Sequence, residues 1–205
     1  MFLGFLGTLS IWGCASKKRT DIPDLSEYSG KRVALIEIDG PSSSKAMVEV
    51  ALVNQLVERG TFILISKREI ERARAKASVN ARDWKALSQA VEADLALKAQ
   101  VLEFDAEESE GYNEEEVYDS QMAEERGKKE GTVKRLYKVK RLIGKVKIGL
   151  QFFRVNSGSV QSATVEESET LERDERKKSI HFPPRLRFME ELVNRAFQKF
   201  FDDFN

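Results

Sequence analysis

Apolar positions in the first part of the chain alternate between strand-like and helix-like spacing. Arg32–Asp39 (RVALIEID) is β-branched and apolar, which predicts a buried strand that ends at Gly40-Pro41. Apolar residues at helical spacing between positions 46 and 57 predict a helix, and Gly60 suits the position that follows its last turn. Residues 61–65 (TFILI) predict a second, fully apolar strand.

Capping residues predict where two further helices begin. Ser66 and Glu69 have the spacing of a capping box, so a helix is expected over about 67–77. Asn80 is expected to cap a third helix. The apolar side chains that this helix would bury are Trp84, Leu87 and Val91.

The second half of the chain predicts three strands and a long C-terminal helix. Residues 94–104 and 132–155 have strand character, although Phe152-Phe153 breaks the alternation of the latter, which predicts a bulge or burial of both faces. Residues 156–159 form a turn, with Gly158 at the position that needs a positive φ, and 160–171 is its partner strand. From about Leu186, apolar residues recur at i, i+3, i+4 and i+7, the strongest helix signal in the chain.

These elements predict an α/β fold. The expected order is β-α-β-α-α-β-β-β-α, in a single mixed-sheet domain with helices packed on the sheet. The expected organisation is a signal peptide over 1–13, a lipidated tether over 14–30 and the α/β domain over 31–205. Within that domain, residues 105–131 are rich in Glu and Lys, which predicts a mobile insertion or a solvated helix.

The charges of two adjoining segments are opposite. Residues 105–131 carry 11 acidic and 3 basic side chains, whereas 132–147 carry 7 basic side chains and no acidic one. The two blocks are therefore expected to fold against each other or to present a two-signed surface. The candidate partner-binding residues are Lys134, Arg135, Tyr137, Lys138, Lys140 and Arg141. The alternative interpretation is a solvated strand face.

Composition excludes several kinds of chemistry. The 205 residues include one Cys and one His, so an internal disulfide, a Cys-type zinc site and most His-based catalysis are excluded. The net charge is zero, which gives no overall attraction to nucleic acid. Asp105, Glu107, Ser109 and Glu116 have offsets of a calcium loop, but Glu110 stands where that loop needs Gly. No cofactor and no metal is expected, and the lone His181 has no partner nucleophile in the sequence.

The single cysteine follows an apolar N-terminal segment. Residues 1–16 contain no charged side chain, and their apolar run is shorter than the about 20 residues that a transmembrane helix needs. The run suits a secretory signal, and Gly13-Cys14 resembles the bacterial lipobox, in which the cysteine is lipidated after cleavage. Trp12 departs from this pattern, and the alternatives are an apolar strand or a buried thiol. Ala15 after the cysteine favours the periplasmic face of the outer membrane.

Four segments of the chain carry a common pattern: the strand Arg32–Asp39, FILISKREIER, WKALSQAVEADLALKAQVLEF and LQFFRVNSGSVQSATVEESET. Together they resemble bacterial lipoproteins of the CsgG/LpoB type. The resemblance implies a non-enzymatic, lipid-anchored periplasmic protein that binds an envelope protein partner and assists its assembly or activity, with self-association into a homo-oligomer also compatible. One alternative is a subunit of an oligomeric outer-membrane secretion channel, but the charged residues of 105–141 are unsuited to a lipid-facing band. Another is an envelope enzyme whose site the sequence does not reveal.

The lipid anchor is testable at one position. Cys14→Ala removes the thiol that would be acylated, so the variant is expected to remain uncleaved or to become soluble. Cell fractionation followed by immunoblotting measures both outcomes. Membrane association equal to that of the wild type would refute the anchor.

Overall fold

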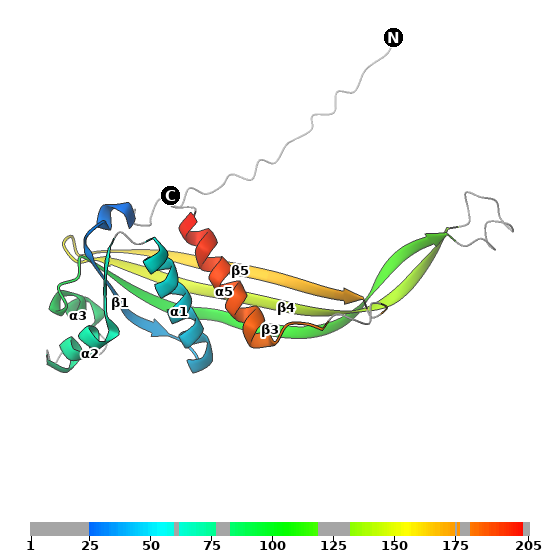
Figure 1. The fold of residues 1–205 in the computed structure, drawn as a ribbon, viewed down its shortest axis with the longest axis horizontal. Coiled ribbons are helices and arrows are strands. Elements are labelled where there is room, and N and C mark those ends of the chain that lie inside the picture. The colour runs from blue at the N-terminus through cyan, green and yellow to red at the C-terminus, as the bar shows by residue number, and fades with distance from the viewer. Residues whose placement is uncertain are drawn as a thin grey trace, which may run out of the picture.

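A computed structural model describes residues 25–59, 62–76, 83–118, 132–174, 176 and 181–202, which form five strands packed with helices (Figure 1). The sheet order is β2-β1-β3-β4-β5; β1 pairs in parallel with β2 and β3, and the other pairs are antiparallel. The predicted single mixed-sheet α/β fold and its element order are confirmed. The elements are the 3-10 helix η1 (Leu25–Tyr28), β1 (Arg32–Asp39), α1 (Ser42–Glu58), β2 (Ile63–Ile65), α2 (Lys67–Lys76), α3 (Trp84–Ala90), β3 (Leu95–Tyr118), β4 (Thr132–Arg154), β5 (Ser159–Asp174) and α5 (Arg185–Asp202).

Helices cover both faces of the inner part of the sheet. The larger core cluster joins α1 and α5 to one face, and the smaller one joins α2 and α3 to the other face near β1. Phe152 packs in the first cluster and Phe153 in the second, and β3 and β4 keep their register there. Burial of both faces therefore explains the broken alternation at this pair. The register shift lies elsewhere, between Val101 and Glu103 of β3.

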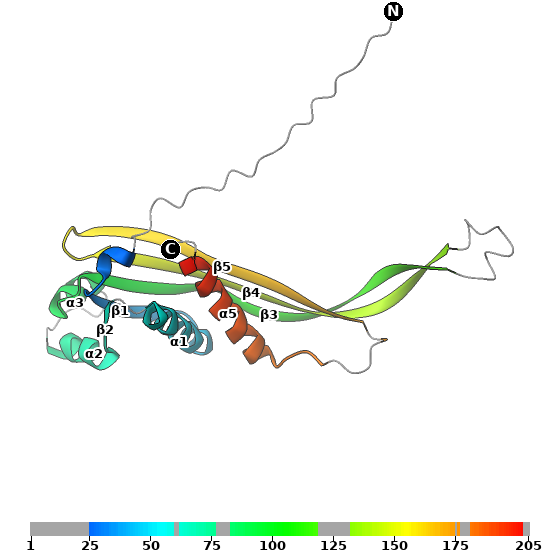
Figure 2. The same cartoon turned by 45° about the horizontal axis from the view of Figure 1, so that its top comes forward.

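Helix α5 has the apolar stripe that its sequence predicts. Its buried residues are Phe188, Met189, Leu192, Val193, Ala196, Phe197, Phe200 and Phe201. The helix lies across β4 and β5 beside α1 (Figure 2). Ion pairs of Lys199 with Glu167 and of Arg195 with Glu169 fix its polar edge to β5. Core packing and these edge contacts together set the position of the helix on the sheet.

The helix starts match the predicted caps only in part. The amide of Glu69 donates to the Ser66 hydroxyl at 3.3 Å, as expected, but the Glu69 carboxylate pairs with Arg32 and does not reach back to Ser66. Asn80 lies outside the described residues. Helix α3 begins later than predicted, because the Asp83 carboxylate accepts from the amide of Ala86.

Two predictions about the polar segments are wrong for the residues that the structure describes. Residues 105–118 are not an insertion or a helix but continue β3 to Tyr118; residues 119–131 are not among those described. Backbone pairing with β4 continues along this extension, and ion pairs between exposed side chains join the acidic residues to basic ones across the strands. The end of the proposed tether is also packed, since Tyr28 of η1 is buried in the larger core cluster.

The close approach of α5 to the sheet depends on Gly144 of β4. A Cβ at this position would lie 3.0 Å from Cζ of Phe188 and 3.1 Å from Leu192, both fully buried. We expect Gly144→Ala to lower the free energy of unfolding by about 1–3 kcal/mol, because the helix must move off the sheet. Gly149→Ala in the same strand is the matched control, since its Cβ would meet Leu102 at an ordinary 3.6 Å. Urea unfolding of both variants measures the difference; equal stabilities would contradict this packing account.

Candidate functional site: a two-stranded charged arm

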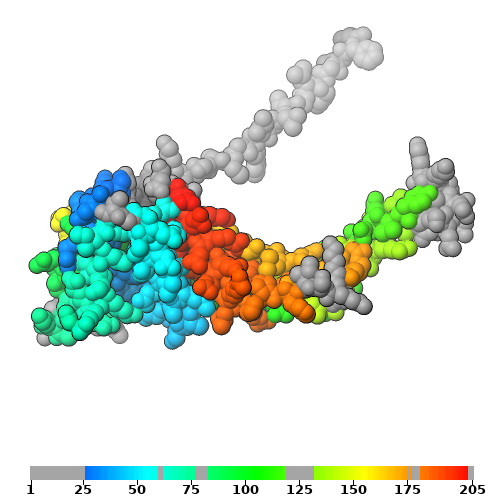
Figure 3. Space-filling view, viewed as in Figure 1, coloured from blue at the N-terminus to red at the C-terminus, as the bar shows by residue number. Residues whose placement is uncertain are grey.

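The outer ends of β3 and β4 form an arm that projects beyond the helices (Figures 1 and 3). Strand β5 pairs with β4 as far as Asp174 opposite Val139, so residues before Val139 have β3 as their only partner strand among the residues that the structure describes. We define the arm as residues 112–118 of β3 with residues 132–138 of β4, which pair from Tyr112 opposite Lys138 to Tyr118 opposite Thr132. An isolated two-stranded ribbon is only marginally stable in water, so side-chain contacts across it matter.

The six sequence-predicted residues lie on β4, but not on one face. Strand alternation places Lys134, Lys138 and Lys140 on the face that carries α5 further inward, which we call the helix-side face. The same alternation places Arg135, Tyr137 and Arg141 on the opposite face. Lys140 and Arg141 belong to the base of the arm, where β5 still pairs with β4. The structure therefore does not bring the six residues together into one basic patch.

Carboxylates of β3 pair with the lysines of the helix-side face. Lys138 and Lys140 both approach Glu110, at 2.7 and 3.7 Å, and Lys134 pairs with Glu114. The hydrogen bond from Lys138 lowers the pKa of the Glu110 carboxyl, and the one to Glu114 raises the pKa of Lys134. These contacts confirm that the acidic and basic blocks fold against each other. A polyanion would therefore meet a balanced surface rather than a basic strip.

Three large apolar side chains stand exposed among these charges. Tyr112, Leu136 and Tyr118 are 69%, 69% and 58% exposed, and their even positions place all three on the helix-side face. The sequence contains a signal for them, because they are isolated apolar residues of one parity within charged segments. That signal has meaning only once the register is known, so sequence reasoning missed Leu136 and did not align the three.

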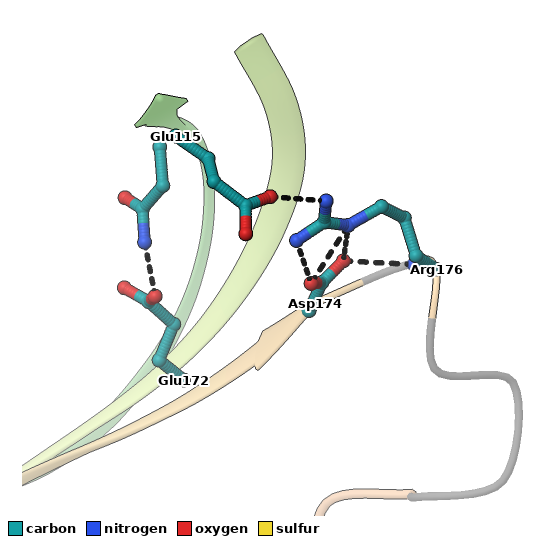
Figure 4. A network of polar contacts seen from close by, with 5 residues as sticks. Glu115, Glu172, Asp174 and Arg176 are labelled. Atoms are coloured by element: carbon teal, nitrogen blue, oxygen red, sulfur yellow. Dashed lines mark hydrogen bonds and ion pairs between the residues drawn. The ribbon is translucent and has the colours of Figure 1, made fainter. Parts of the chain in front are cut away.

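The opposite face of the arm is joined to β5 by a polar network (Figure 4). Arg176 pairs with Asp174 and with Glu115, each at 2.6 Å, and its guanidinium lies 3.8 Å from the ring centroid of Tyr137. The hydrogen bonds to Asp174 and Glu115 raise the pKa of Arg176 above its usual value. These contacts cross from the end of β5 to both strands, so they brace the arm against the sheet.

A second set of contacts lies beside this network at the base of the arm. Arg141 donates to Glu172 and to Asn113, each at 2.8 Å, and the Asn113 side chain in turn donates to Glu172. Figure 4 shows Glu172 beside the group of Glu115, Asp174 and Arg176. Tyr137 and Arg141 therefore brace the arm, whereas the exposed apolar groups lie on the helix-side face.

Other candidate chemistry is placed apart. Asp105, Glu107 and Glu116 lie along the extended β3 rather than around a loop. In the part of the chain that the structure describes, no three His, Cys, Asp or Glu side chains come together as metal ligands. A surface hollow of about 540 Å³ is lined by Glu103, Glu166 and Glu167, but Lys147 and Lys199 pair with the latter two. His181 is exposed, and Cys14 lies outside the described residues.

No protein-family model matches the sequence, and no curated protein matches it. Solved structures with a similar arrangement include the LpoB C-terminal domain from Escherichia coli, with 13% identity, a TM-score of 0.41, and coverage of 69% of this chain and 85% of that chain. Lipoprotein GNA1162 from Neisseria meningitidis has 10% identity and a TM-score of 0.40, and the match covers 84% of this chain and 99% of that chain. A PelC dodecamer from Paraburkholderia phytofirmans has 13% identity and a TM-score of 0.36, and the match covers 85% of this chain and 89% of that chain. At these values the chain is not assigned to a family. Among the described residues, no helix combines the length and apolar character needed to cross a membrane.

The ion pair at the base of the arm predicts a shifted titration. Because Lys138 favours the ionised form of Glu110, it stabilises the arm at neutral pH, and this contribution is lost as the pH falls through the lowered pKa. Lys138→Met is expected to raise the pKa of Glu110 part of the way to its ordinary value, since Lys140 remains nearby. Carboxyl ¹³C NMR titration measures this, with Lys145→Met on the opposite face as the control. An unchanged Glu110 titration in Lys138→Met would contradict the pairing.

Proposed function

We propose that this chain is a non-enzymatic, lipid-anchored protein of the outer membrane that faces the periplasm and binds an envelope protein through the helix-side face of its arm. The position of Cys14 directly after an apolar run supports the anchor. The sequence resemblance to CsgG/LpoB-type lipoproteins supports the class of function.

The observation that carries the proposal is the line formed by Tyr112, Leu136 and Tyr118. An arm that needed only to remain soluble would carry polar residues at these three positions, because exposed apolar side chains do not contribute to solubility. Tyr side chains are enriched at protein interfaces because they combine a large apolar body with a polar end. Glu110, Lys138 and Glu114 lie beside Tyr112 and Leu136, and Lys134 lies between Leu136 and Tyr118, so charges of both signs lie among the apolar groups.

The chemistry of this surface suits a protein better than a polymer of one charge. Acidic and basic groups lie opposite each other across the two strands, so a partner needs apolar side chains with charges of both signs between them. The braced opposite face holds the arm in position, which reduces the entropy that binding would cost.

Site-specific crosslinking in cells tests the proposed surface. A photoreactive amino acid at Tyr112 or at Leu136 is expected to form an adduct with the same envelope protein. The control position is Val160, which is 40% exposed at the opposite end of the sheet and should not form this adduct. Mass spectrometry of the adducts identifies the partner, and equal adduct yields at all three positions would contradict the proposal.

A loss-of-contact variant gives an independent measure. With the photoreactive group at Thr132, Leu136→Ser combined with Tyr118→Ser is expected to reduce the adduct yield at least about fivefold, because central apolar contacts dominate interface energies. Leu102→Ser combined with Val160→Ser is the matched control, since both residues are exposed but lie outside the arm.

The size of the detergent-extracted protein distinguishes a partner of another kind from self-association, because a large homo-oligomeric ring would exclude a monomeric adaptor.

A further inference from the structure

Strand β1 has an unpaired edge over its second half. Strand β2 has only three residues and pairs with β1 from Arg32 to Ala34. On its other side β1 pairs with β3 as far as Asp39. From Leu35 onward, the main-chain groups that face away from β3 therefore have no partner strand in the described part of the chain. Such an edge is a template for the addition of a further strand.

A groove follows this unpaired edge. It has a volume of about 640 Å³ and lies between α1 and α2, which flank β1 on its two sides (Figure 1). Its apolar lining includes Leu35 and Ile38 from the strand, Val53 from α1 and Ile70 from α2. A strand laid along this edge would place alternate side chains toward α1 and toward α2, so both of its faces would be covered.

The charges around the groove leave basic groups without partners. Glu37 pairs with Lys98, and Glu49 pairs with Lys67, while Glu71 lines the groove, is exposed, and forms no ion pair with any residue that the structure describes. Among the described residues, Lys45 and Arg74 form no ion pair, and Nε of Arg74 is buried with no hydrogen-bond acceptor. A buried donor without an acceptor is costly, and a carboxylate is the group that best satisfies a guanidinium.

We propose that this groove binds an extended segment of another polypeptide, which adds a strand beside residues 35–39 of β1 and places a carboxylate against Arg74. Because each strand rises about 3.3 Å per residue, the five residues 35–39 of β1 can pair with about five residues of the bound segment. Main-chain hydrogen bonds to the open edge hold the segment, and its apolar side chains fill the space beside Val53 and Ile70. The site is separate from the arm, so the inference does not depend on the proposed function.

Peptide selection tests this site with defined probes. A random dodecamer library displayed on phage is panned against the purified full chain, and enriched peptides are synthesised for affinity measurements and for amide NMR. We expect enriched peptides to carry an acidic residue and to shift the amide signals of residues 35–39. Val53→Trp, which fills the groove, is expected to weaken binding at least about tenfold, whereas Val50→Trp on the exposed side of α1 leaves it within about twofold.

Two further comparisons separate strand addition from other modes of binding. Arg74→Glu is expected to weaken the acidic peptides at least about tenfold, whereas Arg72→Glu, which lies on α2 outside the groove, changes affinity little. Methylation of alternate peptide nitrogens should abolish binding, and methylation of the intervening ones should not. The proposal is wrong if no enriched peptide distinguishes Val53→Trp from Val50→Trp, if the peptides shift arm signals instead, or if every N-methylated peptide binds equally. Circular dichroism of each variant confirms that it is folded.

Discussion

The antiparallel pairing of β3 with β4 is the contact on which the rest of this structure depends. It begins with Leu95 opposite Arg154 inside the core and ends with Tyr118 opposite Thr132 at the far end of the arm. In its inner half, apolar side chains of the two strands support helices on both faces. In its outer half, charged pairs across the strands replace the core. One register therefore positions both the folded body and the exposed surface.

Elements that bury a face could be predicted from sequence, because burial leaves a periodic pattern. Helix α5 and strand β1 are examples: the stripe from Phe188 onward and the run RVALIEID each match the observed element. Strand β2 is shorter than its apolar sequence predicts, since only Ile63–Ile65 pairs with β1. Its predicted end at Ile65 is observed, because Ser66 caps α2 directly afterwards, and the difference lies at its start, where residue 61 is outside the described residues.

The arm could not be predicted from either of its strands alone. From its own sequence, the segment 105–118 is predicted to be acidic and solvated. The residues with which it pairs lie on β4, distant in sequence, so the segment alone does not show that it is a strand. The basic residues of β4 are evident in the sequence, but their division between two faces follows from the alternation of a strand. The exposed line of Tyr112, Leu136 and Tyr118 combines residues from both strands, so it exists only in the paired structure.

The order of charges across the outer sheet has a consequence for solubility. From Val139 to Arg154, strand β4 lies between two acidic neighbours, β3 with Glu103 to Glu110 and β5 with Glu166 to Asp174. Both long free edges of this region are therefore negative. If a second copy approached edge to edge, carboxylates would face carboxylates, and the repulsion would oppose uncontrolled growth of the sheet into aggregates. In this three-stranded part, the basic strand is enclosed and the two acidic strands hold the accessible edges, whereas the edge of β4 is uncovered only in the arm.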